Sequence, residues 1–162
     1  MGKMTYALVT AATALAIANP AVASAAPDGG SGKTLVPLLS NYKSCDFIES
    51  NWVDARGYGR GTAYLSSTGS TVSADVDLAT GQLNTHYDVR IIQLPRPSIG
   101  CAPGAPGVIT GSLQTDGTGA GRTTLSGPVQ EGATGAWIIM QRPAQFSQTP
   151  AEFYTSEFIA KI

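Results

Sequence analysis

The stretch TVSADVDLATGQLNTHYDVRII (residues 71–92) decides the fold of this chain, because it holds two strand patterns joined by a short polar connection. In the first pattern, apolar residues alternate with Ser and Asp, which is the two-residue period of a β-strand with one buried face. The predicted inward residues are Val72, Ala74, Val76 and Leu78. Asp75 and Asp77 are then expected on the outward face.

The second pattern, HYDVRIIQL (residues 86–94), predicts another strand of the same kind. Tyr87, Val89 and Ile91 are expected to point inward, and His86 and Asp88 are expected to point outward. Two amphipathic strands so close together indicate an antiparallel sheet with one face on a core.

Further strand patterns surround this pair, and turn residues separate them. TAYLSS (residues 62–67) lies upstream, and the patterns downstream are VITGSLQT (108–115), RTTLSGPV (122–129), GAWIIMQ (135–141) and EFYTSEFIAKI (152–162). About seven short strands without a helical period predict an all-β fold, a single antiparallel β-sandwich of the immunoglobulin-like type. Trp137 is expected in its core. Before the last strand, Thr149, Pro150 and Glu152 fit the start of a helix, which predicts one helical turn there.

The stretch QTDGTGAGRTTL (residues 114–125) resembles a phosphate-binding loop at first sight, because three glycines alternate in it. A phosphate loop needs a helix N-terminus directly after its glycines, and its spacing differs from the G-x-G-x-G found here. A strand pattern follows instead, and Asp116-Gly117 between two strands favours a hairpin turn. The sequence therefore predicts a structural turn.

The N-terminus has the pattern of an export signal. Lys3 precedes the apolar run YALVTAATALAIA (residues 6–18), and small residues at Ala23 and Ala25 fit a signal-peptidase site. A membrane anchor is the alternative, but Pro20 interrupts the apolar run. We expect a signal peptide in residues 1–25, a flexible lead-in in 26–40 and the β-sandwich domain in 41–162.

Charge is nearly balanced over the sequence, with 10 Lys and Arg against 11 Asp and Glu and a formal net charge of −1. The two signs are interspersed, without a basic run. Proteins that bind nucleic acid or anionic membrane surfaces carry clustered positive charge, so neither class of partner is expected, and no membrane span is expected after cleavage.

Two cysteines, Cys45 and Cys101, are the only ones in the chain. In an exported protein such a pair predicts one disulfide. The bond would close a loop of about 57 residues and stabilise the fold by about 4 kcal/mol through the lost entropy of the unfolded chain. Two lone thiols and one histidine do not complete a zinc or copper site, so no metal and no cofactor are predicted.

Residues with catalytic potential are few. His86 is the only histidine, and a small extracellular hydrolase would use it with Asp88 or with the pair Asp75 and Asp77. No G-x-S-x-G elbow accompanies it. Polar residues are also expected at these positions simply because they lie on the solvent-exposed faces of amphipathic strands. A non-catalytic protein is therefore the leading hypothesis, and the hydrolase is the alternative.

Aromatic residues in NWVDARGYGRG (residues 51–61) are the binding candidates. Trp52 and Tyr58, beside Arg56, are suited to stack on a sugar ring or to contact a protein partner. The alternative is that Trp52 closes one end of the sandwich. The Pro/Gly loop around Cys101 is a second candidate surface.

The spacing of Thr85, Tyr87 and Val89 resembles the T-x-Y-x-V motif of fibronectin type III modules, in which the tyrosine bonds to nearby backbone. The same strand pair is similar to that of Cu/Zn superoxide dismutase and chordin-type sandwiches. Their His-x-His ligands are absent here, where Arg90 and Ile92 stand in the corresponding region, so the resemblance implies no metal chemistry.

Three longer stretches, PSIGCAPGAPGVITGSLQTDGTGAGRTT, GATGAWIIM and SQTPAEFYTSEFIA, resemble small exported proteins of actinobacteria that are uncharacterised. This resemblance implies export and no activity. We therefore expect a secreted or cell-envelope protein that is a binding or structural module, with an envelope glycan or a protein as its partner.

Overall fold

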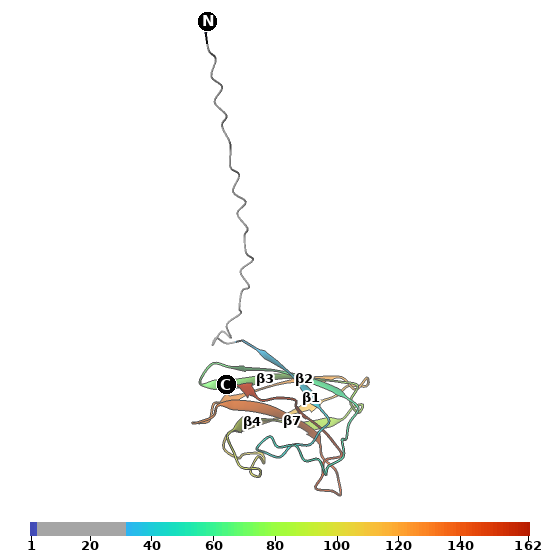
Figure 1. Cartoon of the computed structure of the whole chain (residues 1–162). Helices are drawn as coiled ribbons and strands as arrows, with labels where there is room; N and C mark the ends of the chain where they lie inside the picture. The colour runs from blue at the N-terminus through green and yellow to red at the C-terminus, as the bar shows by residue number, and fades with distance from the viewer. Residues whose placement is uncertain (3–31) are drawn as a thin grey trace.

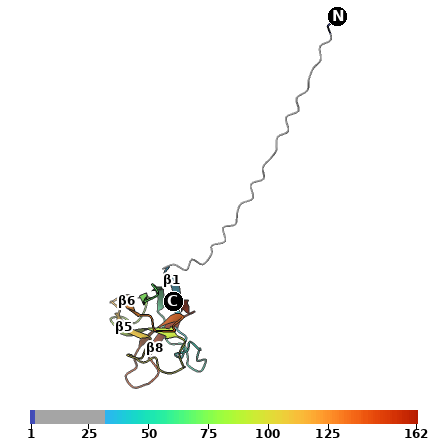
Figure 2. The same cartoon turned by 90° about the vertical axis from the view of Figure 1, so that its left-hand side faces the viewer.

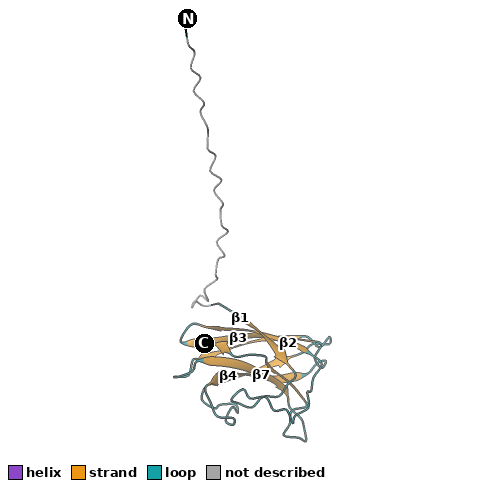
Figure 3. Ribbon diagram, in the orientation of Figure 1, coloured by secondary structure: helices purple, strands orange, loops and turns teal. Residues whose placement is uncertain are grey.

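The computed structural model describes residues 1–2 and 32–162, and within them all regular structure is β-strand (Figures 1 and 3). The strands are β1 Thr34–Leu39, β2 Arg60–Ser67, β3 Thr71–Ala79, β4 His86–Leu94, β5 Val108–Gln114, β6 Gly121–Pro128, β7 Gly135–Arg142, β8 Glu152–Ser156 and β9 Ala160–Lys161. In these described ranges no helix is long and apolar enough to cross a membrane. The predicted signal peptide lies almost wholly in residues 3–31, outside the described part.

All strand pairs are antiparallel and belong to one sheet in the order β5-β4-β7-β8-β1-β2-β3-β6, with β9 added to β7. The sheet curls on itself, so that β1, β2 and β3 form one layer and β4 and β7 the other (Figure 1). Its two end strands, β5 and β6, lie side by side, which nearly closes a barrel (Figure 2). The predicted all-β antiparallel class is confirmed, but the sandwich of about seven strands is not, because nine strands share one continuous sheet.

β1 lies within residues 26–40, the expected lead-in, so regular structure already begins there at Thr34. Val36 and Leu38 of this strand are buried in the interior. Proline is rare inside a sheet because it has no N–H to donate to a neighbouring strand. In an antiparallel strand the N–H and C=O of one residue point to the same side, and the Pro37 carbonyl accepts a hydrogen bond from Glu157 N. The missing N–H therefore removes nothing from the ladder to β2.

The main core fills the barrel interior with alternate residues of the strands, which confirms the predicted inward faces of β3 and β4. All seven residues predicted to point inward are at most 2% exposed: Val72, Ala74, Val76, Leu78, Tyr87, Val89 and Ile91. Side chains from β1, β5, β7 and β8 pack against them.

A second apolar cluster lies on the outer side of β4 and β7. Ile92, Trp137 and Ile139 form it, and Phe47 packs its ring edge-on against Trp137 at 5.5 Å between centroids. Residues 40–59, the cover segment, supply Phe47 and shield this face. Trp137 is therefore buried as predicted, but outside the barrel interior.

The predicted disulfide Cys45–Cys101 is present and ties the cover segment to the loop between β4 and β5. Lys43 of the cover segment is buried; its ammonium donates to the Ser156 carbonyl and lies 4.0 Å from the Phe47 ring centre. Covalent and polar bonds thus hold the cover segment in addition to apolar contact.

The helical turn predicted before the last strand is absent, and β8 begins at Glu152. Ala151 N donates to Arg142 O, and Glu152 pairs with Arg142 in the ladder between β8 and β7. The sheet satisfies these backbone groups, so the capping pattern is overridden by strand pairing.

Candidate functional site

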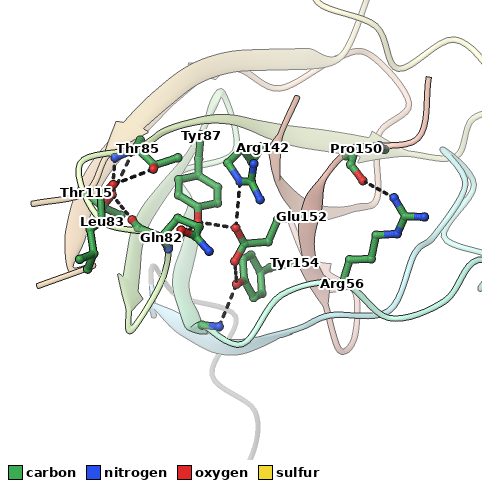
Figure 4. A network of polar contacts seen from close by, with 11 residues as sticks. Arg56, Gln82, Leu83, Thr85, Tyr87, Thr115, Arg142, Pro150, Glu152 and Tyr154 are labelled. Atoms are coloured by element: carbon green, nitrogen blue, oxygen red, sulfur yellow. Dashed lines mark hydrogen bonds and ion pairs between the residues drawn. The ribbon is translucent and has the colours of Figure 1, made fainter. Parts of the chain in front are cut away.

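A buried carboxylate, that of Glu152, lies between Tyr87, Tyr154 and Arg142 (Figure 4). The backbone passes close to the two tyrosine hydroxyls at Gly57, Gly59 and Gly81. Glu152 is buried there, with its side chain 6% exposed. Its Oε2 accepts a hydrogen bond from the Tyr87 hydroxyl at 2.7 Å and one from Arg142 Nε at 3.2 Å, and its Oε1 accepts one from the Tyr154 hydroxyl. We call these four side chains the glutamate network.

The two tyrosine hydroxyls of the glutamate network also accept hydrogen bonds from backbone N–H groups. Gln82 N donates to Tyr87 at 3.0 Å, and Gly59 N donates to Tyr154 at 2.8 Å. Burial, and then the bond to Glu152, raise the pKa of Tyr87 to about 12, and the same causes raise the pKa of Tyr154. Each hydroxyl is thus neutral at pH 7 and both donates and accepts a hydrogen bond, so the network fixes the backbone at Gln82 and Gly59.

The backbone of residues 56–59 lies directly on this network. A Cβ atom built on Gly57 would approach the Tyr154 hydroxyl oxygen to 2.6 Å, and one on Gly59 would approach it to 2.7 Å. Phe153 N donates to Arg56 O at 3.1 Å, and Arg56 Nη1 donates to Pro150 O at 3.4 Å (Figure 4). Glycine is therefore required on both sides of Tyr58, whose backbone is held in place.

Three aromatic side chains on the loops are largely exposed. Trp52 is 83%, Tyr58 96% and Phe146 91% exposed. Trp52 and Tyr58 belong to the cover segment, while Phe146 lies in the loop between β7 and β8. Trp52 does not close an end of the barrel, which leaves the ring free for contact with a partner.

The residues of the hydrolase hypothesis are dispersed over the surface. His86 Nε2 lies 3.2 Å from Asp88 Oδ1, and both side chains are exposed. Asp75 binds Lys33, and Asp77 binds Arg122, each at 2.5 Å, on the outer face of β3. In residues 32–162 no group of three or more His, Cys, Asp or Glu side chains is arranged to hold a metal ion.

The glycine stretch after β5 forms a turn. Asp116 Oδ1 accepts hydrogen bonds from the Thr118 hydroxyl at 2.7 Å, from Thr118 N at 2.8 Å and from Ala120 N at 3.0 Å. The bond from the Thr118 hydroxyl, and then the two backbone bonds, lower the pKa of Asp116. β6 follows immediately, as predicted, and no helix N–H groups are presented to a phosphate.

The Pro/Gly loop around Cys101 also has an architectural role. Arg96 donates to the carbonyls of Gln93 and Gly100, each at 2.9 Å, and to that of Pro106 at 2.5 Å. A small cavity opens beside Arg96 toward residues 130–133. The Arg96 guanidinium is bound to these three backbone carbonyls, so Arg96 holds the loop together.

Sequence reasoning missed Glu152 and Phe146. The signal for Glu152 is the alternation in EFYTS, which places Glu152, Tyr154 and Ser156 on one face of a strand. The capping pattern obscured this alternation. Phe146 stands alone in a polar loop, and nothing in the surrounding sequence marks it.

Comparisons of the chain with protein-family models, with curated proteins and with solved structures found no match. The function therefore has to be inferred from the geometry of the site.

Proposed function

We propose that the protein is a secreted or cell-envelope binding module without catalytic activity, whose binding surface is the loop region that carries Trp52 and Tyr58. The observation that carries this proposal is that Tyr58 is 96% exposed while the backbone on both sides of it is anchored. Exposed aromatic rings are costly to keep in water and supply large contact areas to a partner.

Anchoring favours binding because a ring on a fixed backbone loses less conformational entropy when a partner arrives. The disulfide agrees with export, since such bonds persist in oxidising compartments.

We also propose that the central strands, residues 71–92, are related to those of immunoglobulin-like sandwiches. The bond from Gln82 N to the Tyr87 hydroxyl, five residues apart, supports it.

The two tryptophans give a direct test, because Trp137 is fully buried and Trp52 is 83% exposed. Acrylamide quenches the fluorescence of an exposed indole far more than that of a buried one. We expect purified cell-wall glycan, or a protein partner captured on the immobilised mature chain, to shield Trp52 from quenching. Replacement of Trp52 by Ala should weaken binding about tenfold.

The matched control is Phe146→Ala, which removes a ring of similar exposure from the other loop. Equal binding by wild type and Trp52→Ala, with both folded, would refute this binding surface. A loss of binding with Phe146→Ala alone would place the surface on the loop between β7 and β8.

A further inference from the structure

We infer that the outer face of β2, continued by Tyr58, binds a neutral oligosaccharide chain that lies along the strand. This inference rests on the proposed binding function and names its ligand class. It also extends the binding surface from the cover segment onto the sheet.

Four outward side chains form a row along this strand. A Cβ atom on Gly59 would meet Tyr154, and one on Gly61 would meet Leu38, so these positions face the interior. The residues between and beyond them face outward; they are Tyr58, Arg60, Thr62 and Tyr64. Successive members are about 7 Å apart, so the row is about 20 Å long and has an aromatic ring at each end. Tyr64 is 41% exposed.

Polar side chains of β3 and β6 lie beside this row, because each is paired across the sheet with a residue of the neighbouring strand. Thr62 pairs with Asp77, which in turn pairs with Arg122. An open depression of the surface lies over Arg60, Thr62, Asp77 and Arg122. A chain lying on β2 therefore has a shallow bed of mixed polar groups beside it.

The chemistry of this bed fits sugar hydroxyls. Arg122 Nε donates to Asp77 Oδ1 at 2.5 Å, and the Thr124 hydroxyl donates to Asp75 Oδ1 at 2.8 Å, so donors and acceptors stand in adjacent pairs. A sugar hydroxyl both donates and accepts, and two neighbouring hydroxyls can bond to such a pair together. The apolar C–H face of a sugar ring packs on an aromatic ring such as that of Tyr58.

The charge on this face favours a neutral ligand over an anionic one. The cationic side chains are Lys33, Arg60 and Arg122, and the anionic side chains are Asp75, Asp77 and Asp116. They balance in number, and two of the cations are already paired with aspartates. An acidic polysaccharide would find no net positive field here.

The experiment is an NMR titration of the 15N-labelled mature protein with neutral hexasaccharides of glucose, mannose and N-acetylglucosamine, and with a uronic-acid hexasaccharide. We expect a neutral hexasaccharide to shift the amide signals of residues 58–64, 75–77 and 122–124. Tyr58→Ala and Tyr64→Ala should each raise the Kd about tenfold, the effect of losing one stacked ring. Thr62→Val, which keeps the size and removes the hydroxyl, should raise it about threefold to tenfold. Phe146→Ala is the control and should leave the Kd unchanged.

The outcomes separate this inference from the binding function on which it rests. If Trp52→Ala abolishes binding and Tyr64→Ala does not change it, the binding module stands and the β2 face is the wrong surface. Preference for the uronic-acid hexasaccharide overturns the charge argument. If none of the neutral hexasaccharides binds, the inference is overturned, while a protein partner captured through Trp52 would still support the binding module.

Discussion

The two outer faces of the barrel differ although the same sheet forms both. On the outer side of β4 and β7 lie Trp137 and Ile139, which the cover segment shields and the disulfide secures. On the outer side of β3 lie Asp75 and Asp77, which are partly exposed and bind cations. One face is a second core, and the other is open to solvent.

This difference shows how outward residues decide what covers a sheet. β7 is buried at Gly135–Met140 without alternation, because both of its faces are packed. β3 alternates between buried and half-buried residues over its length, because only its inner face is packed. The covered face stabilises the fold, and the open face is free to serve a ligand.

The largest effect is expected from Trp137→Ala, which empties the centre of the covered face. Trp137 is fully buried, and loss of a buried Trp side chain costs about 3–5 kcal/mol in the free energy of unfolding. Urea denaturation monitored by circular dichroism measures this change. Tyr64→Ala on the open face is the control, and a similar loss there would remove the distinction between the faces.

Loss of the disulfide should have the next largest effect. Cys45 and Cys101 are 56 residues apart in sequence, and replacing both by Ser should lower the free energy of unfolding by about 2–4 kcal/mol. The cover segment should loosen first, because it is the part tied by the bond. Hydrogen exchange should then increase at the amides of Ser44 and Ser50, which bond within this segment. If hydrogen exchange instead increased equally at the amides of both outer faces, the disulfide would not hold the cover segment in particular.

A third test measures how stability depends on pH, which at alkaline pH should reflect the glutamate network rather than either outer face. The pKa of Tyr87 is raised to about 12 in the folded state, against about 10 in the unfolded chain. The unfolded state therefore loses this proton first, so stability is complete below pH 10 and falls as the pH rises toward 12. We expect the urea midpoint to decline over this range.

Tyr87→Phe should remove part of the alkaline decline. It should also cost about 1–3 kcal/mol at pH 7, because Glu152 loses a donor and Gln82 N loses its acceptor. Titration of the tyrosinate absorbance at 295 nm follows the ionisation directly. A Tyr87 that ionises near pH 10 in the folded protein would contradict the buried bond.

Strand alternation was sufficient to predict the all-β class, the inward faces of β3 and β4 and the burial of Trp137. The disulfide followed from two cysteines in a chain with an export pattern. Closure of the sheet was not predictable, because strand order depends on pairings such as that of β1 with β8, which no local pattern encodes. β1 was not predicted, because it contains Pro37. A proline fits inside a sheet where its missing N–H leaves no gap in a ladder, and the sequence does not show to which side that group points.

The candidate site was predictable only in part. The aromatic residues of the cover segment stood out in the sequence because glycines surround them. The glutamate network unites residues 65 positions apart in sequence, Tyr87 and Glu152, and only the three-dimensional register brings them together. The polar row on β2 likewise appears only when β3 and β6 are placed beside it.

The smallest effect on stability is expected from Asp77→Asn on the open face. Its bond partner Arg122 is 76% exposed at the side chain, and exposed ion pairs contribute about 0–1 kcal/mol to folding. The urea midpoint should therefore hardly change, in contrast to Trp137→Ala. Binding of a neutral hexasaccharide should nevertheless weaken, since the amide keeps one acceptor oxygen but loses the charge that strengthens hydrogen bonds to sugar hydroxyls. Were Asp77→Asn to destabilise the protein by as much as a core substitution, the open face would be structural as well, and its polar residues would need no ligand to explain them.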